Sequence, residues 1–153
     1  MKFETDFDAL CRDLSALTEG VPYVIANLAN TAALLWERME GLNWAGFYML
    51  TDGALVLGPF QGKTACIRIP LGRGVCGTAA EQGRTQLVEN VHDFPGHIAC
   101  DSASNSEIVV PLYKDGALWG VLDLDSPLPR RIGRGWRKRP KEYRVFYKIA
   151  STY

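Results

Sequence analysis

Two Asp-Gly turns constrain the fold of this chain more than any other feature. Asp52-Gly53 and Asp115-Gly116 each separate two segments with the alternating pattern of β-strands. An Asp-Gly pair between two such segments is a strong signal for an antiparallel hairpin. The predicted strands are 43–50, 54–60, 65–69, 86–89, 106–113 and 117–125.

The first 40 residues have helical periodicity instead. An apolar stripe predicts a helix over 3–19, which ends at Gly20. A second helix is predicted from Pro22, a residue that suits a first helical turn, to Met39. The inward side chains are expected to be Phe3, Phe7, Leu10, Leu14 and Leu17 in the first helix and Val24, Ala32, Leu35 and Trp36 in the second. Helices followed by hairpins predict an α+β fold, a central antiparallel sheet with the N-terminal helices packed on one side.

Length and composition predict one soluble domain. The chain has 153 residues, and no apolar run approaches the roughly 18 residues that a membrane span needs. The acidic N-terminus carries no hydrophobic signal block, so a cytoplasmic protein is expected. Residues 1–127 contain eight Lys/Arg and sixteen Asp/Glu, whereas residues 128–153 contain nine and one. We therefore expect a catalytic domain over 1–127, helical in 1–40, and a basic tail over 128–153.

A group of acids marks the last hairpin. Asp123 and Asp125 alternate with leucines, so both carboxylates share one face of a strand. A three-residue loop over 114–116 would pair Tyr113 with Ala117 and bring Glu107 opposite Asp123. The same register places Ile108, Val110, Leu112, Leu118, Leu122 and Leu124 together on the core face. A two-residue loop would break this arrangement, because a one-residue slip turns every side chain to the other face.

Three crowded carboxylates can do acid chemistry. Repulsion makes at least one of them hold its proton more tightly, so it can serve as a general acid near neutral pH. The others can bind an ammonium group. A solvated acidic strand end accounts for the sequence equally well.

The cysteines suggest redox chemistry. Cys66, Cys76 and Cys100 are separated by ten and then 24 residues, and two thiols that approach in space form a redox pair. Cys76 begins a short helix predicted at 75–81, where the helix dipole should lower its pKa, so local reasoning makes it the nucleophile. Cys100 lies in a long irregular segment over 90–105, which could carry it over the acids. Cys11 fits a core position.

Two further motifs have plain interpretations. The glycine pattern over 72–77 matches a dinucleotide fingerprint, but that site needs a parallel strand–helix–strand unit. We interpret it as a tight turn against a ligand pocket. Trp44 either walls that pocket or packs in the core. The chain has no C-x-x-C motif and only His92 and His97, and His97 is expected to be a loop residue rather than a base, so no metal site is expected.

Several segments together resemble the free methionine-(R)-sulfoxide reductases, which have a GAF fold. The resemblance spans about residues 20–127 and rests on the segments 43–48, 58–62, 74–77, 96–102 and 120–127. It implies thiol-dependent reduction of the free amino acid sulfoxide without a metal or organic cofactor. It implies that Cys100 attacks the sulfur and Cys66 resolves the sulfenic acid as a disulfide, with Cys76 auxiliary. The implied pocket residues are Trp44, Glu107, Asp123 and Asp125, and the implied partners are a thioredoxin-like reductant and a second subunit.

The implied roles replace the local preference for Cys76 as the nucleophile. The tail departs from the family pattern, which suggests an altered C-terminus such as a shifted reading frame and puts the dimer in doubt. Helical spacing predicts a short helix there that includes Tyr143, Phe146, Tyr147 and Ala150. A basic tail could instead contact RNA, which we disfavour. The main alternative function is a GAF sensor domain that binds a small molecule without catalysis.

Overall fold

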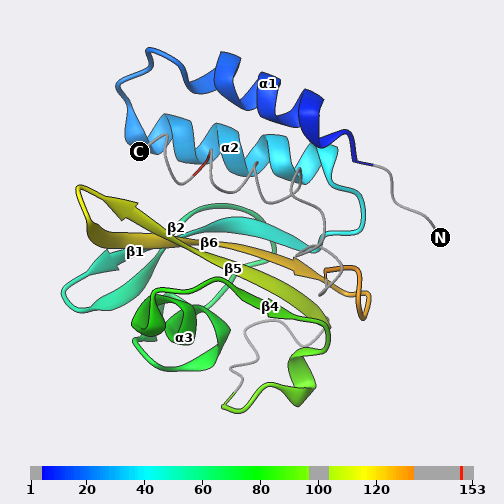
Figure 1. The fold of residues 1–153 in the computed structure, drawn as a ribbon, viewed down its shortest axis with the longest axis vertical. Helices are drawn as coiled ribbons and strands as arrows, with labels where there is room; N and C mark the ends of the chain where they lie inside the picture. The colour runs from blue at the N-terminus through cyan, green and yellow to red at the C-terminus, as the bar shows by residue number, and fades with distance from the viewer. Residues whose placement is uncertain (1–4, 97–103, 133–148, 150–153) are drawn as a thin grey trace.

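The computed structural model describes residues 5–96, 104–132 and 149, and it contains one antiparallel sheet with helices on both faces (Figure 1). The six strands lie in the order β3-β2-β1-β6-β5-β4. The elements are α1 (Phe7–Thr18), α2 (Val24–Arg38), β1 (Trp44–Thr51), β2 (Ala54–Gly62), β3 (Arg68–Pro70), α3 (Gly74–Gln82), β4 (Gln86–Val88), the 3₁₀ turn η1 (Val91–Asp93), β5 (Ser106–Lys114) and β6 (Ala117–Ser126). The predicted α+β class and antiparallel sheet are confirmed.

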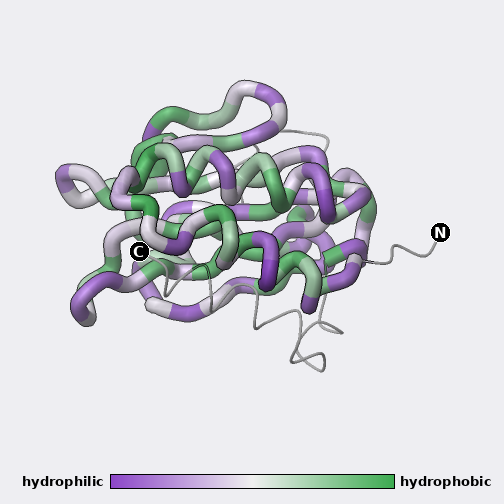
Figure 2. The backbone as a smooth tube through the Cα atoms, turned by 90° about the horizontal axis from the view of Figure 1, so that it is seen from above, coloured by the Kyte–Doolittle hydropathy of each residue, from purple (hydrophilic) through white to green (hydrophobic). Residues whose placement is uncertain are grey.

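The N-terminal helices form the layer on one side of the sheet, as predicted, with α1 outside α2 (Figure 1). Seen from that side, apolar and polar residues alternate along the helical turns (Figure 2). The Asp6 side chain accepts a hydrogen bond from the Ala9 amide and caps α1. Leu10 and Leu14 are buried, but Leu17 is 37% exposed and Thr18 is buried instead. The prediction for Leu17 was wrong because the buried face of α1 follows Leu10, Leu14 and Thr18 at a spacing of four, and Leu17 lies about 100° around the helix from Thr18.

Helix α2 differs from the prediction in three residues. Ala32 and Leu35 are buried as expected, but Val24 and Trp36 are exposed. Trp36 follows Leu35 directly, so a turn of about 100° carries it off the buried face. Val24 is the first residue of the helix and lies within an exposed run over residues 21–26. Pro22 was expected in the first helical turn, but Tyr23 is the N-cap, so Pro22 lies just outside the helix.

The β5–β6 hairpin corrects the predicted register. Its loop has two residues, because Lys114 pairs with Ala117, and the register then shifts between Leu112 and Tyr113. Trp119 is the extra residue in β6, since Tyr113 pairs with Leu118 and Leu112 with Gly120. A two-residue loop alone would have turned the acids away from one another, but the extra residue restores the original facing.

This irregularity has two consequences for the predicted faces. Glu107 pairs with Asp125, and Asp123 pairs with Val109, so the predicted Glu107–Asp123 pair was wrong although all three acids do share a face. Leu118 lies on the turn side of the extra residue. It therefore packs on the α3 face, against the prediction, whereas Ile108, Val110, Leu112, Leu122 and Leu124 lie in the core under α2.

The sheet separates two hydrophobic cores, one under α1 and α2 and one under α3. Two residues of the predicted basic tail, Ile132 and Ile149, are buried in the first core. The expected tail helix with Tyr143, Phe146, Tyr147 and Ala150 lies outside the described residues, apart from helical Ile149. In the part of the chain that the structure describes, no helix combines the length and apolar character that crossing a membrane requires.

The corrected face of α1 can be tested with a matched pair of substitutions. Leu14→Ala removes a side chain that is 3% exposed and should cost about 2–5 kcal/mol of unfolding free energy. Leu17→Ala on the same helix should cost less than about 1 kcal/mol. Chemical denaturation of both variants measures the difference. Equal losses would show that the helix buries a different face.

Candidate active site

One cavity lies on the α3 side of the sheet, over the central strands β1, β5 and β6. Four of the residues singled out from the sequence as pocket residues line it, together with one of the three cysteines. The lining residues are Trp44, Tyr48, Thr64, Ala65, Ile69, Arg73, Gly74, Val75, Cys76, Ser104, Glu107, Asp123 and Asp125. Segments far apart in the sequence therefore converge on a single site.

The acids of this cavity are buried. Glu107 is 7% exposed and Asp123 is 5% exposed, while Asp125 is half-buried. This burial excludes the alternative of a solvated acidic strand end. Their neighbours along the strands, Ile108 and Leu124, point into the opposite core, so the alternation of each strand holds the carboxylates in the cavity.

Burial and crowding change the acidity of these groups. The pKa of Glu107 is raised well above its usual value, first by burial and then by the charge of Asp123. The pKa of Asp123 is likewise raised well above its usual value, by burial and then by the charge of Asp125. Of the described residues that line the cavity, Arg73 alone is basic, and it is exposed. The cavity therefore favours protonated carboxyl groups, and a cationic ligand would offset their charge when they ionise.

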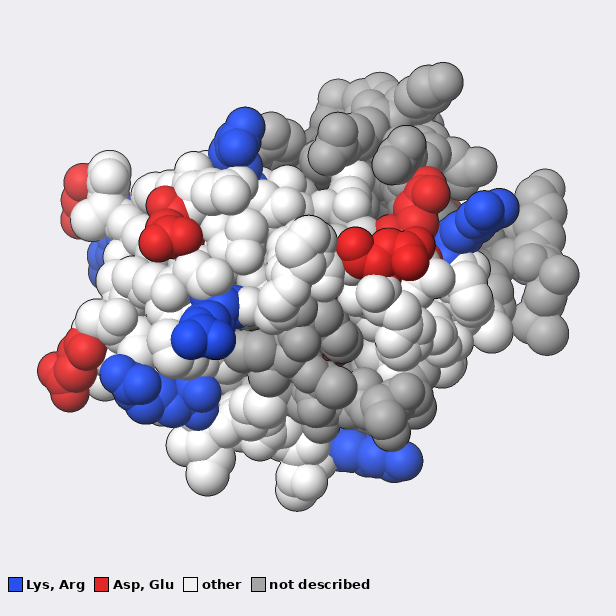
Figure 3. Space-filling model, turned by 90° about the horizontal axis from the view of Figure 1, so that it is seen from below, with Lys and Arg blue, Asp and Glu red and all other residues white. Residues whose placement is uncertain are grey.

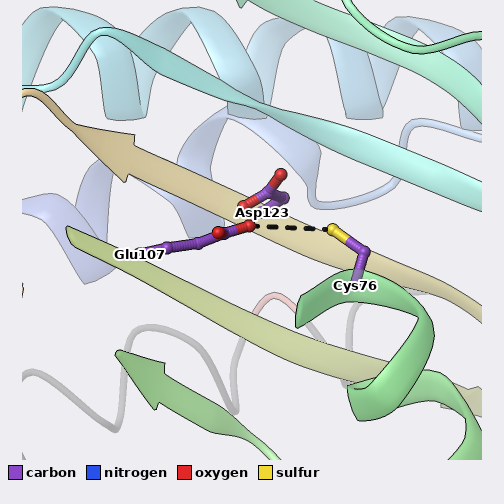
Figure 4. Close-up of side chains that lie close together, drawn as sticks. All are labelled: Cys76, Glu107 and Asp123. Carbon is purple, nitrogen blue, oxygen red and sulfur yellow. Dashed lines mark hydrogen bonds between the residues drawn. The ribbon is translucent and has the colours of Figure 1, made fainter. Parts of the chain in front are cut away.

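Cys76 reaches the acids from α3. Figure 4 shows its side chain and those of Glu107 and Asp123 pointing toward one another, and Cys76 Sγ lies 3.9 Å from Glu107 Oε1. Burial raises the pKa of the Cys76 thiol, and the charges of Asp123 and Glu107 raise it further. The prediction of a lowered pKa was wrong, because the helix terminus faces buried carboxylates rather than solvent or a cation.

Stacked aromatic rings form the cavity wall. Trp44 stacks on Tyr48 with ring centroids 5.8 Å apart and on Phe60 with centroids 5.2 Å apart. The Trp44 Nε1–H donates to the Lys63 carbonyl oxygen at 3.1 Å, which fixes the ring. A Cβ on Gly46 would come within 2.8 Å of that ring, so glycine leaves room for it. Sequence reasoning missed Tyr48, although Trp44 and Tyr48 share a face of one strand by alternation.

The other cysteines differ in state and place. Cys66 is disulfide-bonded, whereas Cys11 and Cys76 carry free thiols. Cys66 does not line the cavity, but Tyr48 Oη donates to its carbonyl oxygen at 2.9 Å, and its neighbour Ala65 is part of the lining. Cys11 packs against the helical core, as predicted. Cys100 lies outside the described residues.

The glycine-rich segment 72–77 is a tight turn into α3. The Gly72 amide donates to the Gly77 carbonyl oxygen at 2.9 Å, which closes the turn. The sheet pairs are antiparallel, so the parallel unit of a dinucleotide site is missing from the described part of the chain. Arg73 and Gly74 line the cavity, which agrees with a turn against a ligand pocket.

The remaining polar residues complete the surroundings. Sequence reasoning also missed Ser104, whose Oγ accepts a hydrogen bond from Asn43 Nδ2 at 3.1 Å and which lies in a segment without a periodic pattern. His92 Nε2 lies 3.1 Å from Asn105 Oδ1, and His97 lies outside the described residues.

The face seen from below carries acidic and basic side chains in small separate groups (Figure 3). The buried acids are thus not part of a broad acidic surface.

Comparisons with known proteins agree with this geometry. The GAF domain family model matches residues 7–150, so the predicted GAF-like fold is confirmed. The free methionine-R-sulfoxide reductase of Escherichia coli K12 is 60% identical over 124 residues, which cover 80% of this chain and 75% of that protein. The reduced fRMsr of Staphylococcus aureus aligns with a TM-score of 0.91 at 42% identity, over 99% of this chain and 98% of that one. A structure of that fRMsr with its substrate gives 0.90 at 42% identity, over 99% of both chains.

The buried acids should make stability depend on pH. The folded protein binds the Glu107 proton more tightly than the unfolded chain, because its folded pKa is raised. Its contribution to unfolding free energy therefore falls as pH rises from the ordinary carboxyl range toward the raised pKa. Glu107→Gln should gain stability relative to wild type over this range, by up to about 1.4 kcal/mol per pH unit.

Denaturant unfolding from about pH 4 to about pH 8 measures this difference. Glu37→Gln, at an exposed position of α2, is the matched control and should follow the wild-type curve. A constant difference between Glu107→Gln and wild type over the whole range would contradict the raised pKa.

Proposed function

The chain belongs to the GAF-domain family of free methionine-R-sulfoxide reductases, and on that premise we propose that it reduces free L-methionine-R-sulfoxide to L-methionine by thiol chemistry. One observation carries the proposal. A single buried cavity gathers an aromatic wall, a thiol and three carboxylates, of which two have raised pKa values. This set suits a small zwitterion with a polar sulfur–oxygen bond.

The acids account for recognition of a free amino acid. Asp123 and Asp125 bind the ammonium group of the substrate, which supplies the positive charge that the cavity favours. A methionine sulfoxide inside a peptide has an amide in place of that ammonium group and brings no charge. Trp44 packs against the sulfoxide methyl group, since its ring forms the apolar side of the cavity.

The reaction combines a thiol and an acid. The Cys100 sulfur attacks the sulfoxide sulfur, and Glu107, which holds its proton because it is buried, protonates the departing oxygen. The transient sulfur–sulfur bond and the sulfur–oxygen bond of the substrate then break as the protonated oxygen passes to the Cys100 sulfur. Methionine leaves, Cys100 becomes a sulfenic acid, and the former thiol proton returns to Glu107. The sulfoxide is reduced by two electrons, and the thiol is oxidised by two.

Cys66 resolves the sulfenic acid. Its thiol attacks the Cys100 sulfur, water leaves, and a Cys66–Cys100 disulfide forms. The disulfide-bonded state of Cys66 and the free thiols of Cys11 and Cys76 support this pairing. The Tyr48 hydroxyl group holds the Cys66 backbone near the cavity. Cys76 is auxiliary, because burial and neighbouring acids keep its thiol protonated and therefore weakly nucleophilic.

A dithiol reductant such as thioredoxin restores the enzyme by thiol–disulfide exchange. Ile67, next to Cys66, is 75% exposed and offers an apolar contact for such a partner. The cycle needs a reducing compartment, so we place the protein in the cytoplasm, and it requires no metal or organic cofactor. We also propose a homodimer, which the exposed apolar side chains Tyr23 and Ile25 support.

A turnover assay tests the nucleophile. With free methionine-R-sulfoxide and dithiothreitol, Cys100→Ser should lower the rate at least about 10³-fold, because Cys76, the thiol in the described cavity lining, keeps its proton and is a weak nucleophile. Cys11→Ser is the matched control and should keep wild-type turnover. Equal rates for Cys100→Ser and wild type would refute the assigned nucleophile, and binding without turnover in wild type would favour the sensor function.

A substrate series tests the role of the acids. N-acetylation removes the ammonium charge and should lower kcat/KM at least about tenfold in wild type, since a hydrogen bond to a charged group contributes about 1.5–3 kcal/mol. Asp125→Asn should lower kcat/KM for the free amino acid and shrink the difference between the two substrates. Asp52→Asn, in the exposed β1–β2 turn, should leave that difference unchanged. An undiminished difference in Asp125→Asn would contradict ammonium recognition by this residue.

A further inference from the structure

Three side chains of the cavity have the arrangement of metal ligands. Cys76, Glu107 and Asp123 come from α3, β5 and β6, and one ligand atom of each lies within 4.8 Å of the other two (Figure 4). In a tetrahedral zinc site, with bonds of about 2.3 Å to sulfur and about 2.1 Å to oxygen, the two ligand atoms lie about 3.6 Å apart. Cys76 Sγ and Glu107 Oε1 are 3.9 Å apart. An ion could therefore bridge them after a small movement of the side chains.

A second observation points to a ligand here. Asp123 is 5% exposed, and its Oδ1 is buried without a hydrogen-bond partner among the described residues. An unsatisfied buried carboxylate oxygen is costly, and a bound cation would remove that cost. Because Asp123 lines the cavity, this oxygen belongs to the same space as the Cys76 thiol. The cluster of Cys76, Glu107 and Asp123 therefore contains a buried oxygen atom that a cation could bind.

The types of ligand atom select the class of ion. Magnesium and calcium prefer shells made only of oxygen, whereas a thiolate with carboxylates suits a thiophilic ion. Asp125 lines the same cavity and can supply a further oxygen ligand. We propose that Cys76, Glu107 and Asp123 bind a thiophilic divalent cation of the zinc class.

This site departs from the sequence-based expectation of no metal. That expectation rested on the missing C-x-x-C motif, but these ligands are 31 and 16 residues apart in the sequence and meet only through the fold. Binding displaces the protons of the Cys76 thiol and of the Glu107 and Asp123 carboxyl groups to solvent and changes no oxidation state. If the proposed function holds, the ion occupies the place of the substrate ammonium group, so metal and substrate exclude each other.

Cobalt(II) is a suitable probe, because sulfur coordination gives it a charge-transfer absorption band. The full chain is titrated without reductant, so that Cys66 stays in its disulfide and the free thiols of the described residues are Cys11 and Cys76. Wild type and Cys11→Ser should show the same band, Cys76→Ser should lack it, and zinc should displace it. Glu107→Gln and Asp123→Asn should weaken cobalt binding at least about tenfold, as the loss of a ligand costs at least as much as that of an outer partner.

Several results would overturn the proposal. The first is the absence of the charge-transfer band in wild type, and the second is a band of equal intensity in Cys76→Ser. The third is a cobalt affinity that is unchanged in both Glu107→Gln and Asp123→Asn. Circular dichroism checks that each variant folds, and Glu107→Gln decides the question if Cys76→Ser does not. Binding needs no turnover, so an inactive protein with a Cys76-dependent band would refute the proposed function alone. An active protein without that band would refute the metal site alone.

Discussion

The structure depends on the burial of carboxylates against the centre of a β-sheet. Glu107 and Asp123 are almost fully buried on a face that otherwise packs α3, and placing such groups away from water is costly unless they are protonated or paired. Among the described residues, acidic side chains are buried at one place only, where β1, β5 and β6 meet α3. A ligand with positive charge relieves this cost. The burial that lowers the stability of the ligand-free protein therefore also favours binding of a cationic ligand and provides a protonated carboxyl group as a proton donor.

The geometry of the hairpin explains how the acids come together. A two-residue turn fixes one register, and the extra residue Trp119 shifts it by one, so that the acids end on the cavity face and Leu122 and Leu124 on the opposite core face. Because side chains alternate along a strand, neither device alone would achieve this. Gly120 permits the close approach of β1, since a Cβ there would lie 2.5 Å from the Tyr48 carbonyl oxygen.

Much of this could be predicted from the sequence. Periodicity and Asp-Gly turns were sufficient for the helices, the hairpins and the α+β class, and alternation placed Asp123 with Asp125. The extra residue in β6 has no local sequence signal, which is why the cross-strand partner of Glu107 and the facing of Leu118 were mistaken. The acidity of Cys76 was mistaken because a pKa depends on groups distant in sequence. The roles of Cys66 and Cys100 came from the family resemblance alone and stay predictions.

Proton retention by the buried carboxyl groups of the empty cavity underlies both the expected pH dependence of stability and the proposed acid catalysis. Infrared spectroscopy of the ligand-free protein near neutral pH measures this directly, because a protonated carboxyl group has its own carbonyl band. Wild type should show such a band, Glu107→Gln should reduce it, and the addition of Asp123→Asn should remove it. A wild-type spectrum with only ionised carboxylates would contradict it.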